Sequence, residues 1–271
     1  MKLKKQSGLQ AIFVAAVSMI VVAGCTQDSA NADVNIERIE VIKSLPDFAS
    51  YADVKEKKKA FFDFMRPIVE NENAKVRAKR ERMMQLREHL DGAELLSESD
   101  SAWLKTLATE YNVELTTVDD QDGWKLLRRR VDTVPFRLAL AQAANESSWG
   151  TSRFAREGFN LFGQWCFSPG CGIVPSKRSK GMTHEVAKYG SVNESVAAYI
   201  RSINRVHMYT PLRKLRRNIR KQGERPTAIE LAQELSGYSE RGEDYVKEIQ
   251  SMIRINYDLM SGPVNVAGKG L

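Results

Sequence analysis

The sequence predicts a mostly α-helical domain with one small β lobe. Apolar residues fill nearly every face of the run FRLALAQAA, from Phe136 to Ala144, which is typical of a helix buried in a core. Segments with helical spacing of apolar residues surround that run, at 53–90, 99–111, 124–131, 194–206, 228–235 and 243–259. The stretch from Cys171 to Tyr189 lacks this spacing, and Gly172, Pro175 and Gly181 mark turns or a small hairpin in it.

The first 24 residues have the layout of a secretory signal. A basic start precedes an apolar stretch from Leu9 to Ala23, which is shorter than the roughly 20 apolar residues that a membrane span needs. The stretch ends in VAGC, which resembles a bacterial lipobox, so we expect Cys25 to carry lipid and become the mature N-terminus. An ordinary signal peptide or an uncleaved anchor is the alternative. Thr26, rather than Asp, follows the cysteine and favours a periplasmic protein anchored to the outer membrane.

The chain between the signal and the central helix divides into two parts. Residues 25–52 are polar and contain Pro46, so we expect a tether whose segment 34–45 forms a short strand or lays apolar residues on the domain. Residues 53–131 are predicted to form a helical region that packs on the following domain. That domain spans 132–260 and precedes a tail at 261–271. Pro67 should kink or divide the first long helix.

The net charge of +7 is compatible with an anionic partner such as a cell wall, a membrane surface or nucleic acid. Removal of the signal takes away Lys2, Lys4 and Lys5 and lowers the charge from +7 to +4. The basic runs at 55–59 and 75–82 are more typical of solvated helix faces than of binding surfaces. Few aromatic residues interleave with them, which disfavours nucleic acid as a partner.

One carboxylate, Glu146, stands at the end of the central helix. Trp149 follows at i+3 and Gln142 precedes at i−4, so all three are predicted to share one side of the helix. A carboxylate beside an aromatic ring at a buried helix is poorly solvated, which raises its pKa toward the range that a general acid needs. On spacing alone, a surface Glu before a helix cap at Gly150 is the commoner case.

A family resemblance changes this balance. The segment AQAANESSWGTSRFA followed by NLFG resembles the signature of the glucosaminidases of glycoside hydrolase family 73, A-x-x-E-S-x-W-G-x-S before N-x-F-G. THEVAKYGSVNESVAAYIRSI, from Thr183 to Ile203, and LSGYSERGEDYVKEI, from Leu235 to Ile249, are similar to two further blocks of that family. WCFSPGCG departs from the commoner NLFG-I-K continuation and places the chain closest to an enterobacterial branch. The resemblance implies a lysozyme-like helical domain with a small β lobe.

The resemblance also implies roles for named residues. It marks Glu146 as the general acid, Glu185 as the second catalytic carboxylate and Tyr238 as a tyrosine of the substrate cleft. Glu194 is the rival for the second carboxylate, but a Glu where a helix begins more often complements the helix dipole. The candidate sugar-binding residues are Trp149, Asn160, Phe162 and Tyr189, of which the aromatic ones have core packing as the ordinary alternative.

Cysteine use fits an oxidising compartment. Cys166 and Cys171 flank Phe-Ser-Pro-Gly, which favours a turn, so we expect them to form a disulfide in the periplasm. With only His184 nearby, the two cysteines offer fewer than the four ligands of a structural zinc site, and we expect no metal. The sequence contains no HExxH motif, P-loop or dinucleotide-binding fingerprint, and we expect no cofactor.

The predicted function is hydrolysis of peptidoglycan glycan strands at the bond between N-acetylglucosamine and N-acetylmuramic acid. Both an inverting mechanism and one assisted by the acetamido group of the substrate are compatible with the sequence. A lytic transglycosylase acting on the same polymer is the alternative enzyme. A catalytically inactive wall-binding lipoprotein is the alternative from a different class.

Overall fold

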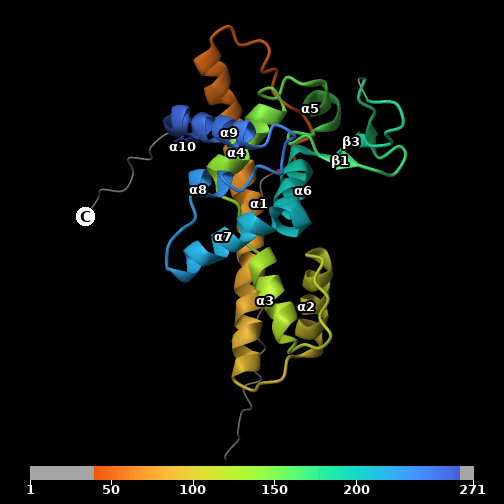
Figure 1. Ribbon diagram of the computed structural model, residues 1–271, viewed down its shortest axis with the longest axis vertical. Helices are drawn as coiled ribbons and strands as arrows, with labels where there is room; N and C mark the ends of the chain where they lie inside the picture. The colour runs from red at the N-terminus through yellow and green to blue at the C-terminus, as the bar shows by residue number, and fades with distance from the viewer. Residues whose placement is uncertain (1–39, 177, 263–271) are drawn as a thin grey trace, which may run out of the picture. The chain divides into compact units, whose positions relative to one another are not determined.

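The computed structural model describes residues 40–176 and 178–262 (Figure 1). The predicted signal peptide, Cys25, most of the tether and most of the tail lie outside these residues. Within the described ranges, no helix is long and apolar enough to cross a membrane.

The first helix, α1, extends over 38 residues from Val54 to Asp91, a length of about 57 Å. It begins where the Asp53 side chain accepts a hydrogen bond from the backbone N–H of Glu56 at 2.8 Å. The helix is continuous through Pro67, so the division that the sequence allowed does not occur. Met65 and Ile68, on either side of the proline, are fully buried in one core, and this packing holds the two halves in a single helix.

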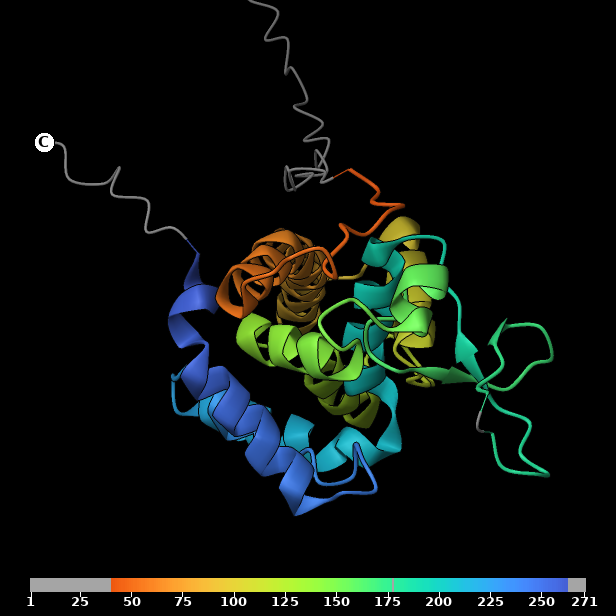
Figure 2. The ribbon, with the colours of Figure 1, turned by 90° about the horizontal axis from the view of Figure 1, so that it is seen from above.

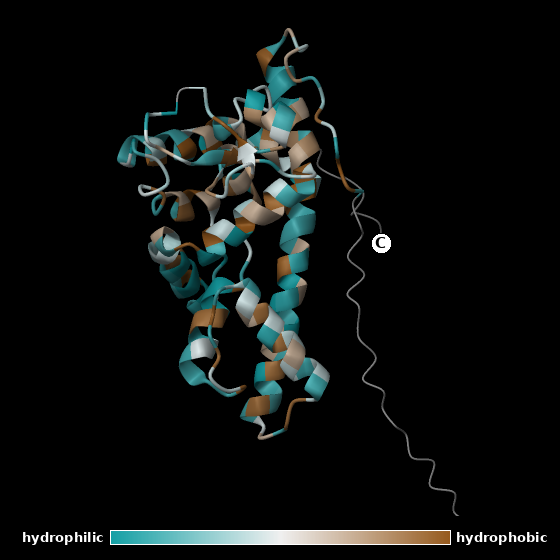
Figure 3. Ribbon diagram, turned by 90° about the vertical axis from the view of Figure 1, so that its right-hand side faces the viewer, coloured by the Kyte–Doolittle hydropathy of each residue, from teal (hydrophilic) through white to brown (hydrophobic). Residues whose placement is uncertain are grey.

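Two separate cores lie along α1. The first half of the helix, with Phe61 and Phe62, packs in the main core with α4 (Phe136–Glu146), α6 (Val192–Arg205), α8 (Ala228–Ala232) and α9 (Glu243–Ile255). The second half, with Met83 and Leu86, packs in a smaller core with α2 (Glu98–Glu110) and α3 (Gln121–Arg130), whose largest buried side chain is Trp124. Figure 1 shows α2 and α3 beside the lower part of α1, and Figure 3 shows hydrophobic positions recurring among the hydrophilic ones of this long helix.

The central helix predicted from the apolar run is α4. Every residue from Leu138 to Ala144 is buried, and the helix contacts α1, α8 and α9 (Figure 2). Pro135 occupies the N-cap position, where the missing N–H of proline costs no helical hydrogen bond. Burial on all sides is the reason for the apolar composition of this helix, and it places the end of α4, Glu146, against several neighbouring elements.

Several shorter elements complete the helical part. They are α5 (Arg153–Gly158), a 3-10 turn (His207–Tyr209), α7 (Thr210–Lys221) and α10 (Tyr257–Ser261). The sequence predicted one helix over 243–259, whereas α9 ends at Ile255 and α10 follows. Asn256 lies at the break, and its side chain donates a hydrogen bond to the backbone oxygen of Met252 at 2.8 Å. This side-chain bond to the last turn competes with continuation of the helix.

The β lobe is a three-stranded antiparallel sheet in the order β1 (Trp165–Cys166), β3 (Glu185–Ala187), β2 (Gly172–Ile173). Cys166 pairs with Glu185, and Gly172 pairs with Ala187. In Figure 2 this lobe projects to one side of the helices. The predicted fold class, mostly α with a small β lobe, is confirmed.

The described part of the predicted tether lays apolar residues on the domain and forms no strand. Phe48 is 1% exposed and packs edge-on against Phe61 of α1. The backbone of Ile42 donates to the side chain of Asn193 and accepts from Val192 N–H, both at 2.9 Å. These contacts join residues 40–52 to the main core.

Candidate functional site

Glu146 is the last residue of α4 and is half-buried. Its Oε1 accepts a hydrogen bond from the Tyr245 hydroxyl at 2.9 Å. Its Oε2 lies on the side of Gly163, since a Cβ atom added to Gly163 would be only 3.4 Å from this oxygen. Burial raises the pKa of Glu146, the Tyr245 hydroxyl opposes that rise, and the nearby charge of Glu248 adds to it. The net direction is upward, as a general acid requires.

A chain of hydrogen bonds leads from the core to this carboxylate. The Tyr199 hydroxyl donates to Oε1 of Gln142 at 2.6 Å, and Nε2 of Gln142 donates to the Tyr245 hydroxyl at 2.9 Å. Tyr245 in turn donates to Glu146. Because Tyr199, Gln142 and Tyr245 are all buried, each step is fixed by packing as well as by hydrogen bonding. The series orients one oxygen of Glu146 and leaves the other facing Gly163.

The structure corrects the predicted side-by-side arrangement of Glu146 and Trp149. The helix ends at Glu146, and Ser148 and Trp149 have φ values of 50° and 60°, in the left-handed region. The Trp149 ring consequently packs edge-on against Phe61 and Phe62 of α1, with centroid distances of 5.7 and 5.2 Å. Trp149 therefore connects α1 to the end of α4.

The NLFG segment forms a braced turn beside the acid. The side chain of Asn160 donates to the backbone oxygens of Gln164 and Ala187, both at 2.9 Å, which joins the turn to β3. Phe162 is 1% exposed and stacks on Tyr199 with a centroid distance of 4.0 Å. Asn160 and Phe162 thus hold the turn in place. The following Gly163, at φ 64°, lies near Glu146, since a Cβ atom on it would be 3.4 Å from Oε2.

Tyr238 joins the same assembly from the loop before α9. Its hydroxyl donates to the backbone oxygen of Phe162 at 2.7 Å. Its ring stacks on Tyr245 with a centroid distance of 5.2 Å and an interplanar angle of 7°. Burial, followed by the neighbouring Tyr245, raises the pKa of Tyr238, so it remains a neutral hydroxyl at physiological pH. Tyr238 is therefore close to the acid but hydrogen-bonded to the turn.

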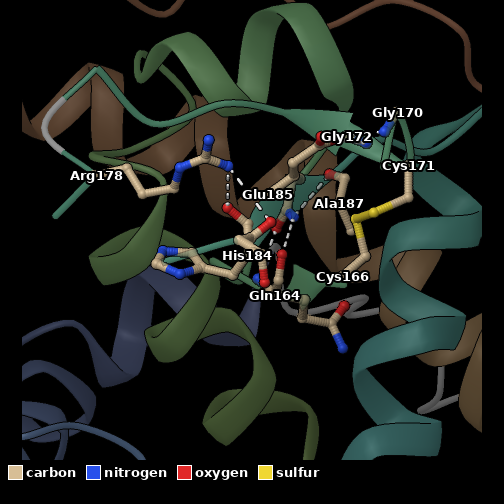
Figure 4. Close-up of a disulfide and its surroundings, with 11 residues drawn as sticks. Gln164, Cys166, Gly170, Cys171, Gly172, Arg178, His184, Glu185 and Ala187 are labelled. Carbon is tan, nitrogen blue, oxygen red and sulfur yellow. Dashed lines mark hydrogen bonds between the residues drawn. A yellow bond between two sulfur atoms is a disulfide. The ribbon is translucent and has the colours of Figure 1, made fainter. Parts of the chain in front are cut away.

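Glu185, the second predicted carboxylate, lies on β3 beside the disulfide loop (Figure 4). Cys166 and Cys171 are joined, which confirms the predicted disulfide. The carboxylate of Glu185 accepts hydrogen bonds from the backbone N–H groups of Gly170, at 3.0 Å, and Gly172, at 2.8 Å. These two donors lower the pKa of Glu185, so it is ionised over a wide pH range.

The two backbone hydrogen bonds that Glu185 accepts should slow hydrogen exchange in the disulfide loop. In Glu185→Gln the charge that strengthens both hydrogen bonds is lost, so the amides of Gly170 and Gly172 should exchange with solvent faster. Hydrogen exchange at neutral pH measures this directly. Glu194→Gln serves as the matched control. Glu194, in the first turn of α6, likewise accepts a hydrogen bond from a backbone N–H, that of Gly190. If exchange at Gly170 and Gly172 is the same in the wild type and Glu185→Gln, the carboxylate does not hold this loop.

The β lobe also carries two exposed aromatic side chains, Trp165 and Phe167, that no sequence motif marks. Trp165 on β1 is 54% exposed and stacks on His184 with a centroid distance of 3.9 Å. Phe167, in the disulfide loop, is 70% exposed. Tyr189, at the end of the lobe, is half-buried and its hydroxyl donates to Oε1 of Gln164 at 2.7 Å. Trp165 and Phe167 thus present more ring surface to solvent than Tyr189 does.

The lobe brings three potential metal-ligand atoms together, from Cys166, Cys171 and Glu185, within 4.8 Å of one another. The two sulfurs are bonded to each other and therefore offer no thiolate. Only one carboxylate is left as a donor, which is too few for a zinc site.

Comparison with known proteins decides the family. The model of the family described as mannosyl-glycoprotein endo-beta-N-acetylglucosaminidase matches residues 123–258. The protein named Protein bax, from Escherichia coli strain K12, is 34% identical over 218 residues, which cover 80% of this chain and 76% of that protein. The chain belongs to the glucosaminidase family. The branch indicated by WCFSPGCG is confirmed by the likeness to Bax.

A solved structure is also similar to this member of the glucosaminidase family. It is the catalytic domain of the autolysin Auto from Listeria monocytogenes, at 18% identity and a TM-score of 0.36, over 66% of this chain and 96% of that chain.

Membership of the glucosaminidase family makes the chain a glycosidase. The family match extends from α3 through α10 and so includes Glu146, Glu185 and Tyr238. Two of the predicted site residues lie near Glu146. Tyr238 stacks on Tyr245, which donates to Glu146, and Phe162 precedes Gly163 in the adjacent turn. Glu185 and Tyr189 lie on or beside the β lobe. Gln142 and Tyr245 complete the surroundings of Glu146. The spacing of Gln142 from Glu146 places it near the carboxylate, but no local pattern signals that Tyr245, 99 residues away, contacts Glu146.

Proposed function

We propose that the protein is an endo-β-N-acetylglucosaminidase that cleaves the bond between N-acetylglucosamine and N-acetylmuramic acid in peptidoglycan, with Glu146 as the general acid. The observation that carries this proposal is a carboxylate whose pKa burial raises and whose orientation the Tyr245 hydroxyl fixes. A general acid must be protonated before it meets the glycosidic oxygen and must be held in position for the transfer. The upward direction of the Glu146 pKa favours the first requirement, the Tyr245 hydrogen bond favours the second, and the chain belongs to a glycosidase family.

Glu185 is the proposed ionised partner. Its surroundings lower its pKa, whereas those of Glu146 raise the pKa of the acid. Two carboxyl groups with pKa values moved in opposite directions are the usual basis for dividing acid and base roles in a glycosidase. In this role Glu185 stabilises the positive charge that develops on the sugar or activates water. Each oxygen of Glu185 accepts one backbone hydrogen bond and keeps a second lone pair for this role.

The exposed rings of the β lobe are the proposed sugar contacts. Pyranose rings present apolar C–H faces that pack on flat side chains, and Trp165 has half of its surface available, 54%. His184 covers one face of that ring by stacking and holds it in a fixed orientation. A fixed aromatic platform costs less side-chain entropy on binding than a mobile one does.

Digestion of purified peptidoglycan tests this function. Mass spectrometry of the released fragments should find N-acetylglucosamine at the new reducing ends. Fragments ending in 1,6-anhydro-N-acetylmuramic acid would instead establish a lytic transglycosylase. Absence of released fragments, with the protein still bound to the polymer, would favour the wall-binding lipoprotein.

We further propose that the enzyme is held at the outer membrane by lipid on Cys25. The support is the short apolar stretch that ends in VAGC and is followed by Thr26. Cys25→Ala should leave an unprocessed or soluble protein without acyl label. Unchanged fractionation and unchanged labelling would contradict lipidation at Cys25.

A further inference from the structure

A concave surface lies at the opposite end of α4 from Glu146. Asp132, Thr133 and Pro135, just before α4, line a cavity of about 480 Å³ together with side chains from α1 and from the end of α7. Because α4 has 11 residues, its two ends are about 16 Å apart. The cavity is therefore separate from the proposed catalytic carboxylate.

The cavity is lined by an excess of positive charge. Its cations are Arg77 and Arg80 of α1, Arg220 of α7 and Arg225 in the loop that follows, against the single carboxylate of Asp132. An adjoining cavity of about 280 Å³ shares Arg80, Asp132 and Arg220 with the first. It adds Lys125, Arg128, Arg129, Arg217 and Lys221.

The carboxylate of Asp132 is already occupied. It is 3% exposed, its Oδ2 accepts a hydrogen bond from Nε of Arg220 at 2.8 Å, and it pairs with Nε of Arg216 at 3.4 Å. Its Oδ1 accepts the N–H of Thr133 at 2.8 Å. Within the described residues, neither Arg77 nor Arg225 forms an ion pair with a carboxylate.

Helix ends account for part of this charge but not for all of it. The C-terminus of α3 attracts cations, and Arg80 donates to the backbone oxygens of Arg128 and Val131 at 2.7 and 2.6 Å. A helix C-terminus carries only about half a negative charge. The ends of α3 and α7 together with Asp132 therefore leave most of the surrounding cations uncompensated. Burial and then Arg220 and Arg80 lower the pKa of Arg216 to about 10, against the opposing effect of Asp132.

We propose that this surface, named here the arginine pocket and lined by Arg77, Arg80, Arg220 and Arg225, binds a ligand that carries phosphate groups. Arginine side chains form paired N–H bonds to phosphate oxygens, and Arg80 and Arg220 are already fixed by the hydrogen bonds just described. Arg77 and Arg225 are exposed at the same cavity and close on the ligand from its rim. The ligand supplies the anion that the pocket lacks.

The test uses the full chain with Cys25→Ala in every protein compared, so that the proposed lipid anchor does not itself bind vesicles. Inorganic tripolyphosphate is the soluble probe, and vesicles of phosphatidylglycerol in phosphatidylcholine are the lipid probe. The pocket variant is Arg77→Glu with Arg225→Glu, which alters two exposed side chains that form no ion pair among the described residues. Lys55→Glu with Lys105→Glu changes the net charge equally on exposed parts of α1 and α2 and is the control. Melting temperatures establish that both variants are folded.

Calorimetric titration at low ionic strength should show that tripolyphosphate binds the wild type and the control. The pocket variant should bind it more weakly, by about tenfold or more for each of its two arginine substitutions. The source of the phosphate is a lipid headgroup if the pocket variant no longer binds vesicles and tripolyphosphate displaces the wild type from them. Tripolyphosphate binding without pocket-dependent vesicle binding identifies a soluble ligand. Equal affinities in the pocket variant and the control, or no binding of either probe by the wild type, would overturn the proposal.

Discussion

Glu146→Gln should lower the kcat for peptidoglycan hydrolysis by about 10²–10⁴-fold. The substitution keeps the size of the side chain and its ability to accept the Tyr245 hydrogen bond, but it removes the proton that must be transferred. Glycan binding should remain close to that of the wild type, since no contact is lost before the transition state. Initial rates of fragment release and a separate binding assay measure the two effects.

The stability of the same variant gives an independent check on burial. Because folding raises the pKa of Glu146, ionisation destabilises the native state once the pH exceeds the unfolded value of about 4.5. Glutamine cannot ionise, so Glu146→Gln should match or exceed the wild-type melting temperature at pH 7. The advantage should vanish in acid, where Glu146 is neutral in both states. Near-normal hydrolysis by a folded Glu146→Gln protein would show that another group supplies the proton.

Tyr245→Phe should lower kcat by about tenfold or more, because it removes the hydrogen bond that stabilises the Glu146 carboxylate as this group gives up its proton. It should also move the alkaline limb of the pH profile of kcat/KM. The hydroxyl lowers the pKa of Glu146, so its removal raises that pKa further, and the acid stays protonated to higher pH. The limb should therefore shift to higher pH, even though the rate at the optimum falls.

Stability and a control variant separate the effect of Tyr245 on Glu146 from a general loss of folding stability. Tyr245→Phe leaves the buried Nε2 of Gln142 without its acceptor, at a cost of about 1–3 kcal/mol in stability. Tyr111→Phe is the matched control, because Tyr111 is equally buried but lies in the smaller core with α2 and α3. The control should leave the rate and the pH profile unchanged. A rate loss in Tyr245→Phe with no shift of the alkaline limb would mean that Tyr245 does not act on the titration of Glu146.

The sequence was most informative where local pattern determines structure. The run from Phe136 to Ala144 predicts a buried helix because it has no polar face, and α4 is buried on all sides. The turn residues between Cys166 and Cys171 correctly predicted their disulfide. Both inferences depend on neighbours along the chain rather than on distant contacts.

Helix α7 was missed for a physical reason. Its apolar positions, Leu212, Leu215 and Ile219, follow a Thr-Pro start and have helical spacing, so the signal was present. Arginines dominate the segment, and arginine is normally solvent-exposed. Here Arg213 is 2% exposed, and its Nη1 donates to the backbone oxygens of Ile203 and Val206, both at 2.8 Å. Backbone acceptors from another part of the chain make this burial possible.

The site was only partly predictable for a similar reason. Spacing and resemblance singled out Glu146, but the residue that orients it comes from α9, and the glycine against its other oxygen comes from the NLFG turn. The position of Trp149 was predicted wrongly because two non-glycine residues, Ser148 and Trp149, adopt left-handed conformations. Packing of the Trp149 ring on α1 stabilises this backbone, and no feature of the local sequence signals that contact.

The most direct test of the account is an infrared difference titration of the wild type against Glu146→Gln, since the difference isolates the carboxyl group of Glu146. We expect one carboxyl group that titrates above the ordinary value of 4.5, with a pKa equal to that of the alkaline limb of kcat/KM for peptidoglycan hydrolysis. A Glu146 carboxyl that ionises at or below 4.5 would contradict the account, since it would hold no proton for the leaving oxygen at neutral pH.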